Sequence, residues 1–225
     1  MKVSGKNVFN ELDKNIIRKV YLSKNFKDKD IIEFIQKNKI KYVISDPKVM
    51  DGMIRNNQGI IVDINDYEYS NLESIDSDFV IILDHLEDPH NFGAIIRTCE
   101  AAGVDGIIIP KNRSVDVTST VIRTSVGASK YVPIIQITNL NQTINELKKN
   151  GYWVVGTDMD GTPYDEIDYK GKTCIVIGSE GFGMSHLVKE NCDFIATIPM
   201  HGKINSLNAS VAAGIVIYEA VRIRK

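Results

Sequence analysis

The sequence has few cysteines. Only three occur in 225 residues, at Cys99, Cys174 and Cys192, and no two of them form a CxxC pair. An odd number of widely spaced cysteines excludes a disulfide framework, and the spacing does not fit a zinc cage. We therefore expect free, buried thiols in a reducing cytoplasm.

Long hydrophobic runs are also missing. No apolar stretch approaches the roughly 20 residues that a membrane-spanning helix needs. The first residues, Met1 to Lys6, contain no apolar core of the kind found in signal peptides. With 43% hydrophobic and 25% charged residues, the chain is predicted to be a folded, soluble, cytoplasmic protein rather than a disordered one.

Net charge is small, at −2, but its distribution is uneven. Residues 1–57 carry 13 Lys/Arg against 7 Asp/Glu, a formal charge of +6, so the remaining 168 residues carry −8. Such a split is a sign of an anionic partner for the basic part. Frequent surface lysines would give the same composition without any such partner.

Hydrophobic spacing divides the chain into a small α/β unit at 1–64, a polar linker at 65–78, and a larger unit at 79–225. In the small unit, the spacing predicts a first helix over 7–18. In the larger unit, short Val/Ile-rich strands alternate with helices, a pattern typical of a parallel α/β sheet. The predicted strands are 79–84, 106–109, 132–136, 152–157, 173–178 and 194–198. The predicted helices are 91–102, 114–126, 140–150, 184–190 and 206–223.

Three familiar cofactor motifs are only partly present. Gly171-Lys172-Thr173 resembles the end of a phosphate-binding loop, but Ile167 stands where the loop needs glycine. Gly178 to Gly183 reads GxxGxG, not the GxGxxG of nicotinamide sites. The four histidines have no HxxxH or HExxH spacing, so we predict no metal site.

Three polar loops follow predicted strands, at 84–97, 178–184 and 198–210. Ligands of open parallel sheets bind at the carboxyl ends of strands, so these loops are candidates for one site. Each also has an ordinary structural explanation. Asn91, Asn205 or Ser206 could cap a helix, Glu180 could complement a helix dipole, and Arg97 could form a surface ion pair.

Taken together, the three loops resemble the motifs of the SpoU (TrmH-like) RNA ribose 2′-O-methyltransferases. The first motif is Asn91-x-Gly93-x-x-x-Arg97-Thr98, and the second is Gly178-Ser179-Glu180-Gly181-x-Gly183-Met184. The third combines Ile198-Pro199-Met200 with Ser206-Leu207-Asn208-x-Ser210-Val211-Ala212. The N-terminal unit resembles the small substrate-binding domain of the same family, and the whole layout is most similar to its bacterial subgroup that methylates a guanosine ribose in large-subunit ribosomal RNA.

This resemblance implies a parallel-sheet domain with a C-terminal trefoil knot, preceded by a small α/β substrate-binding domain. It implies S-adenosylmethionine as the cofactor, held by Gly178, Ile198, Met200 and Leu207. It also implies a homodimer with the last helix near the interface.

The resemblance places five residues in the reaction itself: Asn91, Arg97, Glu180, Ser206 and Asn208. The family assigns the base to the position of Arg97. Because an arginine guanidinium normally stays protonated in proteins, a phosphate clamp that also stabilises a forming alkoxide is the alternative role.

The implied partner is RNA, which would meet the basic small unit and the arginines at 97, 113 and 123. Charge attracts phosphate without selecting sequence, so these residues do not identify the nucleotide. Transfer RNA is the alternative substrate. Two other classes stay open: a non-catalytic RNA-binding ribosome-assembly factor of the same fold, and a nicotinamide-dependent enzyme, which the missing fingerprint disfavours.

Overall fold

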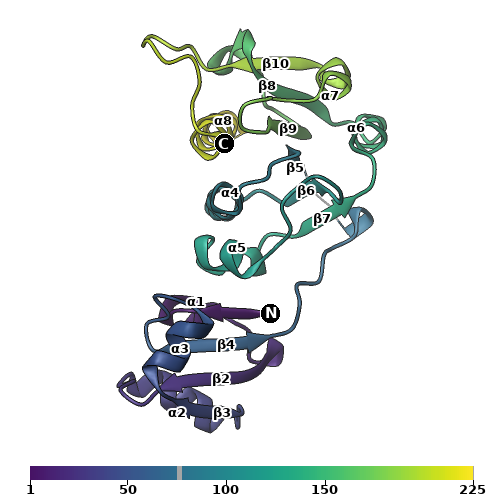
Figure 1. Ribbon diagram of the computed structural model, residues 1–225. Helices are drawn as coiled ribbons and strands as arrows, with labels where there is room; N and C mark the ends of the chain where they lie inside the picture. Colours follow the sequence, from purple (N-terminus) through teal and green to yellow (C-terminus); the bar gives the residue numbers. More distant parts are fainter. Residues whose placement is uncertain (75–77, 225) are drawn as a thin grey trace.

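The fold contains two separate sheets, which Figure 1 shows one above the other. This computed structural model describes residues 1–74 and 78–224, so residues 75–77 of the predicted linker lie outside the described residues. The predicted fold class is confirmed: a parallel α/β sheet follows a small α/β unit. The boundaries of the three predicted segments and the trefoil knot stay predictions.

The N-terminal sheet has four strands in the order β1-β4-β2-β3. Its antiparallel strands are β1 (Lys2–Ser4), β4 (Ile60–Ile64) and β2 (Ile17–Ser23), and β3 (Tyr42–Ser45) pairs parallel to β2. The helices of this unit are α1 (Lys6–Glu11), α2 (Lys29–Lys37) and α3 (Pro47–Met53).

The first predicted helix, over 7–18, is wrong beyond Glu11. Leu12 is extended, and Asp13 accepts a hydrogen bond from Asn15 N at 2.9 Å, which begins a single 3₁₀ turn instead. Ile17 then pairs with Ile64 as the first residue of β2. A local hydrogen bond to an aspartate thus ends the helix, although the apolar pattern continues beyond it.

The C-terminal sheet has six parallel strands in the order β10-β8-β9-β5-β6-β7. In chain order they are β5 (Phe79–Asp84), β6 (Gly106–Pro110), β7 (Ile134–Ile137), β8 (Trp153–Pro163), β9 (Thr173–Gly178) and β10 (Phe194–Thr197). The helices are α4 (Pro89–Ala102), α5 (Ser119–Thr124), α6 (Leu140–Lys149), α7 (His186–Asn191) and α8 (Ala209–Arg224).

Helices cover both faces of this sheet, with α4, α5 and α8 on one side and α6 and α7 on the other (Figure 1). The central strand β5 is buried along its whole length. Its residues Ile81 and Leu83 pack with the first group of helices, and Val80 and Ile82 pack with the second. Burial on both faces explains why the strand is a continuous apolar run without polar alternation.

Side-chain caps make two of the predicted helices begin later than their apolar patterns indicate. Thr118 accepts a hydrogen bond from Val121 N, so α5 begins at Ser119 and the preceding residues form a loop. Asn208 accepts from Ser210 N and Val211 N, so α8 begins at Ala209 rather than 206. The delayed start of α8 leaves Ser206, Leu207 and Asn208 in the loop that precedes it.

The two units meet at α5 and the turn that follows it. The Tyr131 hydroxyl donates to Glu11 Oε2 at 3.0 Å, and the Tyr67 hydroxyl donates to the Ser129 carbonyl at 3.2 Å. Burial raises the pKa of Tyr67 to about 12. A Cβ on Gly127 would lie 2.5 Å from Glu11 Cβ, so the backbones approach closely here because residue 127 is glycine.

All three cysteines are free. Burial raises the pKa of Cys99 and Cys174, and it raises that of Cys192 to about 12. Thiols with such raised pKa values stay protonated near neutral pH and behave as packing groups.

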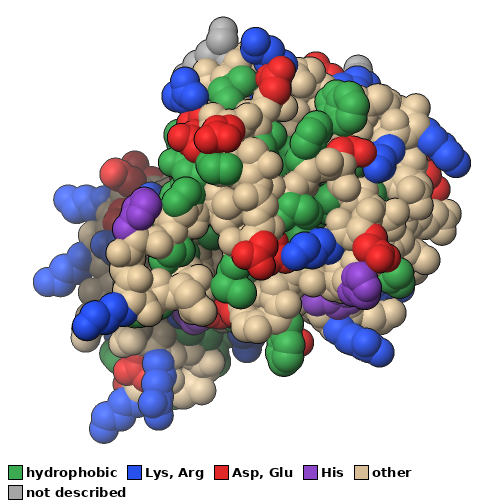
Figure 2. All heavy atoms as spheres, turned by 90° about the horizontal axis from the view of Figure 1, so that it is seen from above, with side chains coloured by type: hydrophobic (Ala, Val, Ile, Leu, Met, Phe, Trp, Pro, Cys, Tyr) green, Lys and Arg blue, Asp and Glu red, His purple; other side chains and the backbone are tan. Residues whose placement is uncertain are grey.

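Figure 2 shows positive and negative side chains interspersed over the face seen from above. That face therefore offers no broad surface of one charge. No helix within the described residues is long and apolar enough to cross a membrane.

Candidate active site

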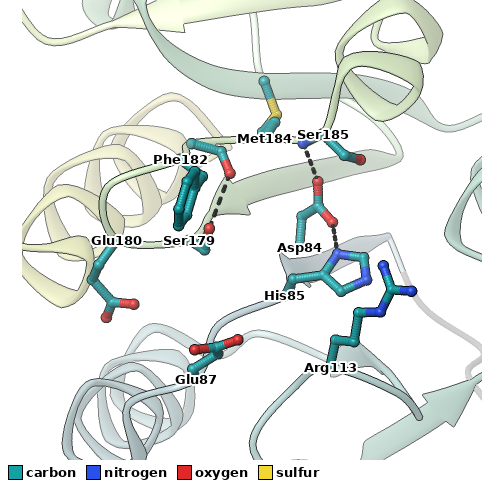
Figure 3. Close-up of a pocket in the computed structure, with 10 residues that line it drawn as sticks. Asp84, His85, Glu87, Arg113, Ser179, Glu180, Phe182, Met184 and Ser185 are labelled. Carbon is teal, nitrogen blue, oxygen red and sulfur yellow. Dashed lines mark hydrogen bonds and ion pairs between the residues drawn. The ribbon is translucent and has the colours of Figure 1, made fainter.

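A crevice lies where the carboxyl ends of β5 and β9 meet. Asp84 and Gly178, the last residues of these strands, are paired in the sheet. The chain leaves β5 through α4 on one face and leaves β9 through α7 on the other, which is the switch-point arrangement that forms binding crevices in open α/β sheets. A cleft of about 340 Å³ opens there (Figure 3). Its lining residues are Asp84, His85, Glu87, Arg113, Ser179, Glu180, Phe182, Gly183, Met184 and Ser185.

A chain of hydrogen bonds joins the three candidate loops at this edge of the sheet. Asn91 Nδ2 donates to Glu180 Oε1, and Asn208 Nδ2 donates to Asn91 Oδ1 at 2.9 Å. These residues are 89 and 117 positions apart in the sequence. Asn91 itself is 8% exposed, so its polar atoms are satisfied by this chain rather than by solvent.

The donor and acceptor roles in this series of hydrogen bonds are fixed at Asn208. Its Oδ1 accepts from the backbone of Ser210 and Val211 and from the Ser210 hydroxyl, so its amide nitrogen is left to donate. Asn91 must then accept with its oxygen and donate with its nitrogen, towards the Glu180 carboxylate. Asn208 therefore both caps α8 and orients the other two side chains.

Helix capping does not explain Asn91, because another residue caps α4. Asp88 accepts from His90 N at 2.8 Å and caps α4, and Pro89 begins the helix. Asn91 is thereby free of the capping role proposed as its ordinary explanation. Its side chain is available to link Glu180 and Asn208.

Glu180 lies on a tight glycine turn. Ser179 and Gly183 exchange backbone hydrogen bonds of 3.0 Å in both directions, and Gly181 and Gly183 have positive φ. A Cβ on Gly178 would lie 2.3 Å from the Gly183 carbonyl carbon. The turn therefore folds directly onto Gly178, and its tip presents Glu180 beside Phe182, which is 94% exposed.

Arg97 is exposed, and within the described residues its guanidinium has no hydrogen-bond or ion-pair partner. The surface ion pair suggested as its ordinary role is therefore not formed among those residues. A free guanidinium on a helix that also carries Asn91 is suited to bind a phosphate or a developing negative charge.

The remaining candidates lie in the loop between β10 and α8. Ser206 is exposed, Met200 and Leu207 are each 38% exposed, and Ile198 is partly buried against the core. The structure thus joins Asn91, Glu180 and Asn208 directly, whereas Arg97 and Ser206 make no hydrogen bond to them. Partly exposed apolar side chains such as Met200 and Leu207 are of the type that lines the apolar slot an adenine ring prefers.

Sequence reasoning missed a pair at the end of β5. Asp84, 1% exposed, holds His85 Nδ1 at 2.5 Å with one carboxylate oxygen and accepts from Ser185 N at 2.6 Å with the other. Figure 3 shows the oriented imidazole facing the cleft beside Arg113. The position of the two residues at the carboxyl end of a buried strand was the signal that could have identified them. Within residues 1–74 and 78–224, no group of three His, Cys, Asp or Glu side chains could hold a metal ion.

Two family models match the chain. Residues 78–218 match the SpoU rRNA Methylase family, and residues 3–70 match the RNA 2′-O ribose methyltransferase substrate binding family. The chain is 44% identical to a putative TrmH family tRNA/rRNA methyltransferase of Staphylococcus saprophyticus, with 99% of this chain and 91% of the relative covered.

Solved structures give the same result. An AdoMet-bound rRNA methyltransferase from Sinorhizobium meliloti superposes with a TM-score of 0.83 at 28% identity, covering 98% of this chain and 86% of that one. The SpoU methyltransferase AviRb from Streptomyces viridochromogenes, at 24% identity and a TM-score of 0.86, covers 99% of this chain and 89% of its own and shows the shared fold.

Proposed function

This chain belongs to the SpoU rRNA methylase family, and we propose that it methylates a guanosine ribose 2′-hydroxyl of large-subunit ribosomal RNA, in the cytoplasm, with S-adenosylmethionine as the methyl donor. The general activity, RNA ribose 2′-O-methylation, follows from membership of the family. The observation that supports the assignment of the site is the hydrogen-bonded chain from Glu180 through Asn91 to Asn208.

Gly178 at the end of β9 and three apolar residues of the loop between β10 and α8 suit the cofactor. Gly178, Ile198, Met200 and Leu207 would hold it, largely through backbone groups and apolar contact. S-adenosylmethionine supplies a methyl group on a sulfonium that leaves readily, so the reaction needs no metal. The hydroxyl oxygen bonds to the methyl carbon, the carbon–sulfur bond breaks with its electron pair left on a neutral thioether sulfur, and the hydroxyl proton passes in the end to solvent water.

The protein has to hold the ribose 2′-oxygen in line with the methyl group. It also has to accept the hydroxyl proton or stabilise the negative charge that develops on the oxygen. Asn91 and Asn208 fix the Glu180 carboxylate in one orientation, and Ser206 lies two residues before Asn208 in the same loop. Such positioning supplies much of the rate of a transfer between two bound partners. Arg97, which has no partner within the described residues, would clamp an RNA phosphate and stabilise the forming alkoxide.

Labelled methyl transfer to fractionated RNA tests the substrate. We expect S-adenosylmethionine carrying a tritiated methyl group to label large-subunit ribosomal RNA purified from a strain that lacks the gene. Label in transfer RNA instead would retain the chemistry and overturn the ribosomal assignment; the relatives' names include both kinds of RNA. Absence of label in every fraction, together with no binding of S-adenosylmethionine in calorimetry, would contradict the enzyme itself.

We also propose that two copies of the chain associate through α8. Val211 and Tyr218 on this helix are each 50% exposed, and small residues such as Ala212 and Gly214 allow a second helix to approach closely. Light scattering should give twice the chain mass of 25.2 kDa, and a mass of one chain at micromolar concentration would contradict the dimer.

A further inference from the structure

The cleft contains charged groups that the proposed reaction does not use. Arg113 and Glu87 both line it, and within the described residues neither has a hydrogen-bond or ion-pair partner. In Figure 3, Phe182 and Glu180 lie on one side of the cleft and His85 and Arg113 on the other, with Glu87 between them. Unpaired donors and acceptors that converge on one cavity are typical of a ligand site.

Two of the residues that line the cleft have strained backbone conformations. His85 and Arg113 have φ values of 57° and 55°, in the left-handed region that residues other than glycine seldom adopt. The two come from different loops, one after β5 and one after β6, and both line the cleft. Strained backbone of this kind clusters at ligand sites because surrounding structure must hold it in place.

Phe182 faces them from the glycine turn. Its ring is 94% exposed, yet the paired backbone bonds between Ser179 and Gly183 fix the turn that carries it. An exposed aromatic ring on a fixed turn beside a cavity provides a stacking surface without contributing to the core.

We infer that this cleft binds the unstacked base of the nucleotide that is methylated, with Phe182 as the stacking surface and Arg113 and Glu87 as the groups that contact the base edge. Single-stranded RNA is read in this way, by aromatic stacking and by hydrogen bonds to base edges. The inference rests on the proposed function, since Glu180 both lines the cleft and accepts from Asn91. A base in the cleft therefore places its ribose next to that hydrogen-bonded chain.

The charge of the cleft favours a base over a phosphate. Glu87 and Glu180 bring two carboxylates to the lining, and Asp84 lies directly behind His85, against one arginine. Carboxylates repel phosphate but accept hydrogen bonds from the amino and imino groups of a base. Arginine donates to ring nitrogen and carbonyl acceptors on the opposite edge.

Substitution of Phe182 tests the stacking surface. We expect Phe182→Ala to raise the KM for RNA by about tenfold or more, with the KM for S-adenosylmethionine unchanged, because base stacking is lost while the cofactor residues are untouched. Phe182→Tyr should restore most of the affinity. The matched control is Leu187→Ala, which removes another exposed apolar side chain, 62% exposed on the adjacent α7, and should leave both constants unchanged.

Fluorescence provides a direct readout of stacking. The sequence contains one tryptophan, Trp153, so a Trp153→Phe, Phe182→Trp double variant carries a single reporter at the cleft. Substrate RNA should quench this reporter, and Arg113→Ala added to the double variant should weaken the titration. The base site alone would be overturned if the wild-type enzyme methylates RNA, Phe182→Ala keeps a normal KM for RNA, and substrate RNA leaves the reporter unquenched. Failure of the wild-type chain to methylate any RNA would instead count against the proposed function.

Discussion

Replacing Arg97 by alanine is expected to lower the rate of RNA methylation by about 100-fold or more without destabilising the protein. The guanidinium is exposed and has no partner within the described residues, so its removal breaks no contact there that the fold depends on. Loss of a group that stabilises developing charge typically costs a factor of about 10²–10³ in turnover. Single-turnover methylation and thermal unfolding of the same preparation measure the two effects separately.

A charge change one turn further along α4 gives the control. Glu100→Ala removes an exposed charge from the same helix and should leave turnover within about twofold of wild type. Near-normal turnover in Arg97→Ala would contradict the account of this residue. Arg97→Lys, measured across a pH series, separates the two roles, because a lysine can act as a base but lacks the planar fork that clamps phosphate.

Gly178→Ala is expected to abolish detectable binding of S-adenosylmethionine and to destabilise the fold by about 1–3 kcal/mol. The added Cβ would lie 2.3 Å from the carbonyl carbon of Gly183 and 2.5 Å from the nitrogen of Met184. Both are backbone atoms, so no side-chain movement relieves the overlap, and the turn that carries Glu180 must shift. Calorimetric titration with the cofactor and urea unfolding measure the two losses.

Gly52→Ala is the matched control for this substitution. Gly52 lies in α3, and an added Cβ there would have no atom within 4 Å. Alanine is the better helix former, so the change should stabilise the chain slightly and leave cofactor binding unaltered. Binding of the cofactor by Gly178→Ala with wild-type affinity would show that the turn does not contribute to the cofactor site.

The strands of the catalytic sheet were the most predictable part of the fold. Runs such as 79–84 and 173–178 are buried on both faces, so the sequence pattern is continuous and leaves little choice. β8 is longer than predicted because Thr162 and Pro163 pair with β10 after an irregularity, although residues 158–161 are two aspartates, a glycine and the exposed Met159. Residues 158–161 thus lack the apolar run that marks the other strands.

Helix boundaries were less predictable than strands because single side chains decide where a helix begins or ends. Asp13, Thr118 and Asn208 each accept backbone hydrogen bonds that end or delay a helix whose apolar pattern is continuous. Capping is worth about 1 kcal/mol, which is enough to set a boundary but too local to alter the periodicity.

The candidate site could be located from sequence but not assembled. Parallel topology alone places the loops after β5 and β9 at one edge, so their proximity follows from the strand pattern. That Asn91 would bridge Glu180 and Asn208 depends on rotamers and on the orientation of two amides, which spacing does not encode. The Asp84–His85 pair, in contrast, lies at the end of a buried strand, so its position could have been recognised from the sequence.

The residues by themselves left a nicotinamide enzyme and a non-catalytic factor open, and membership of the family decides for the methyltransferase. Roles of individual site residues stay predictions that the variants above test. In the proposed base site, the base is contacted by Phe182, Arg113 and Glu87, none of which is a defined position of the three motifs.

Alkaline hydrolysis of the labelled RNA tests the central claim most directly. A methyl group on the 2′-oxygen removes the nucleophile that cleaves the neighbouring phosphodiester, so the account predicts that the label is recovered in alkali-resistant dinucleotides. Recovery of the label in mononucleotides would place the methyl group on a base and contradict ribose 2′-O-methylation by this chain.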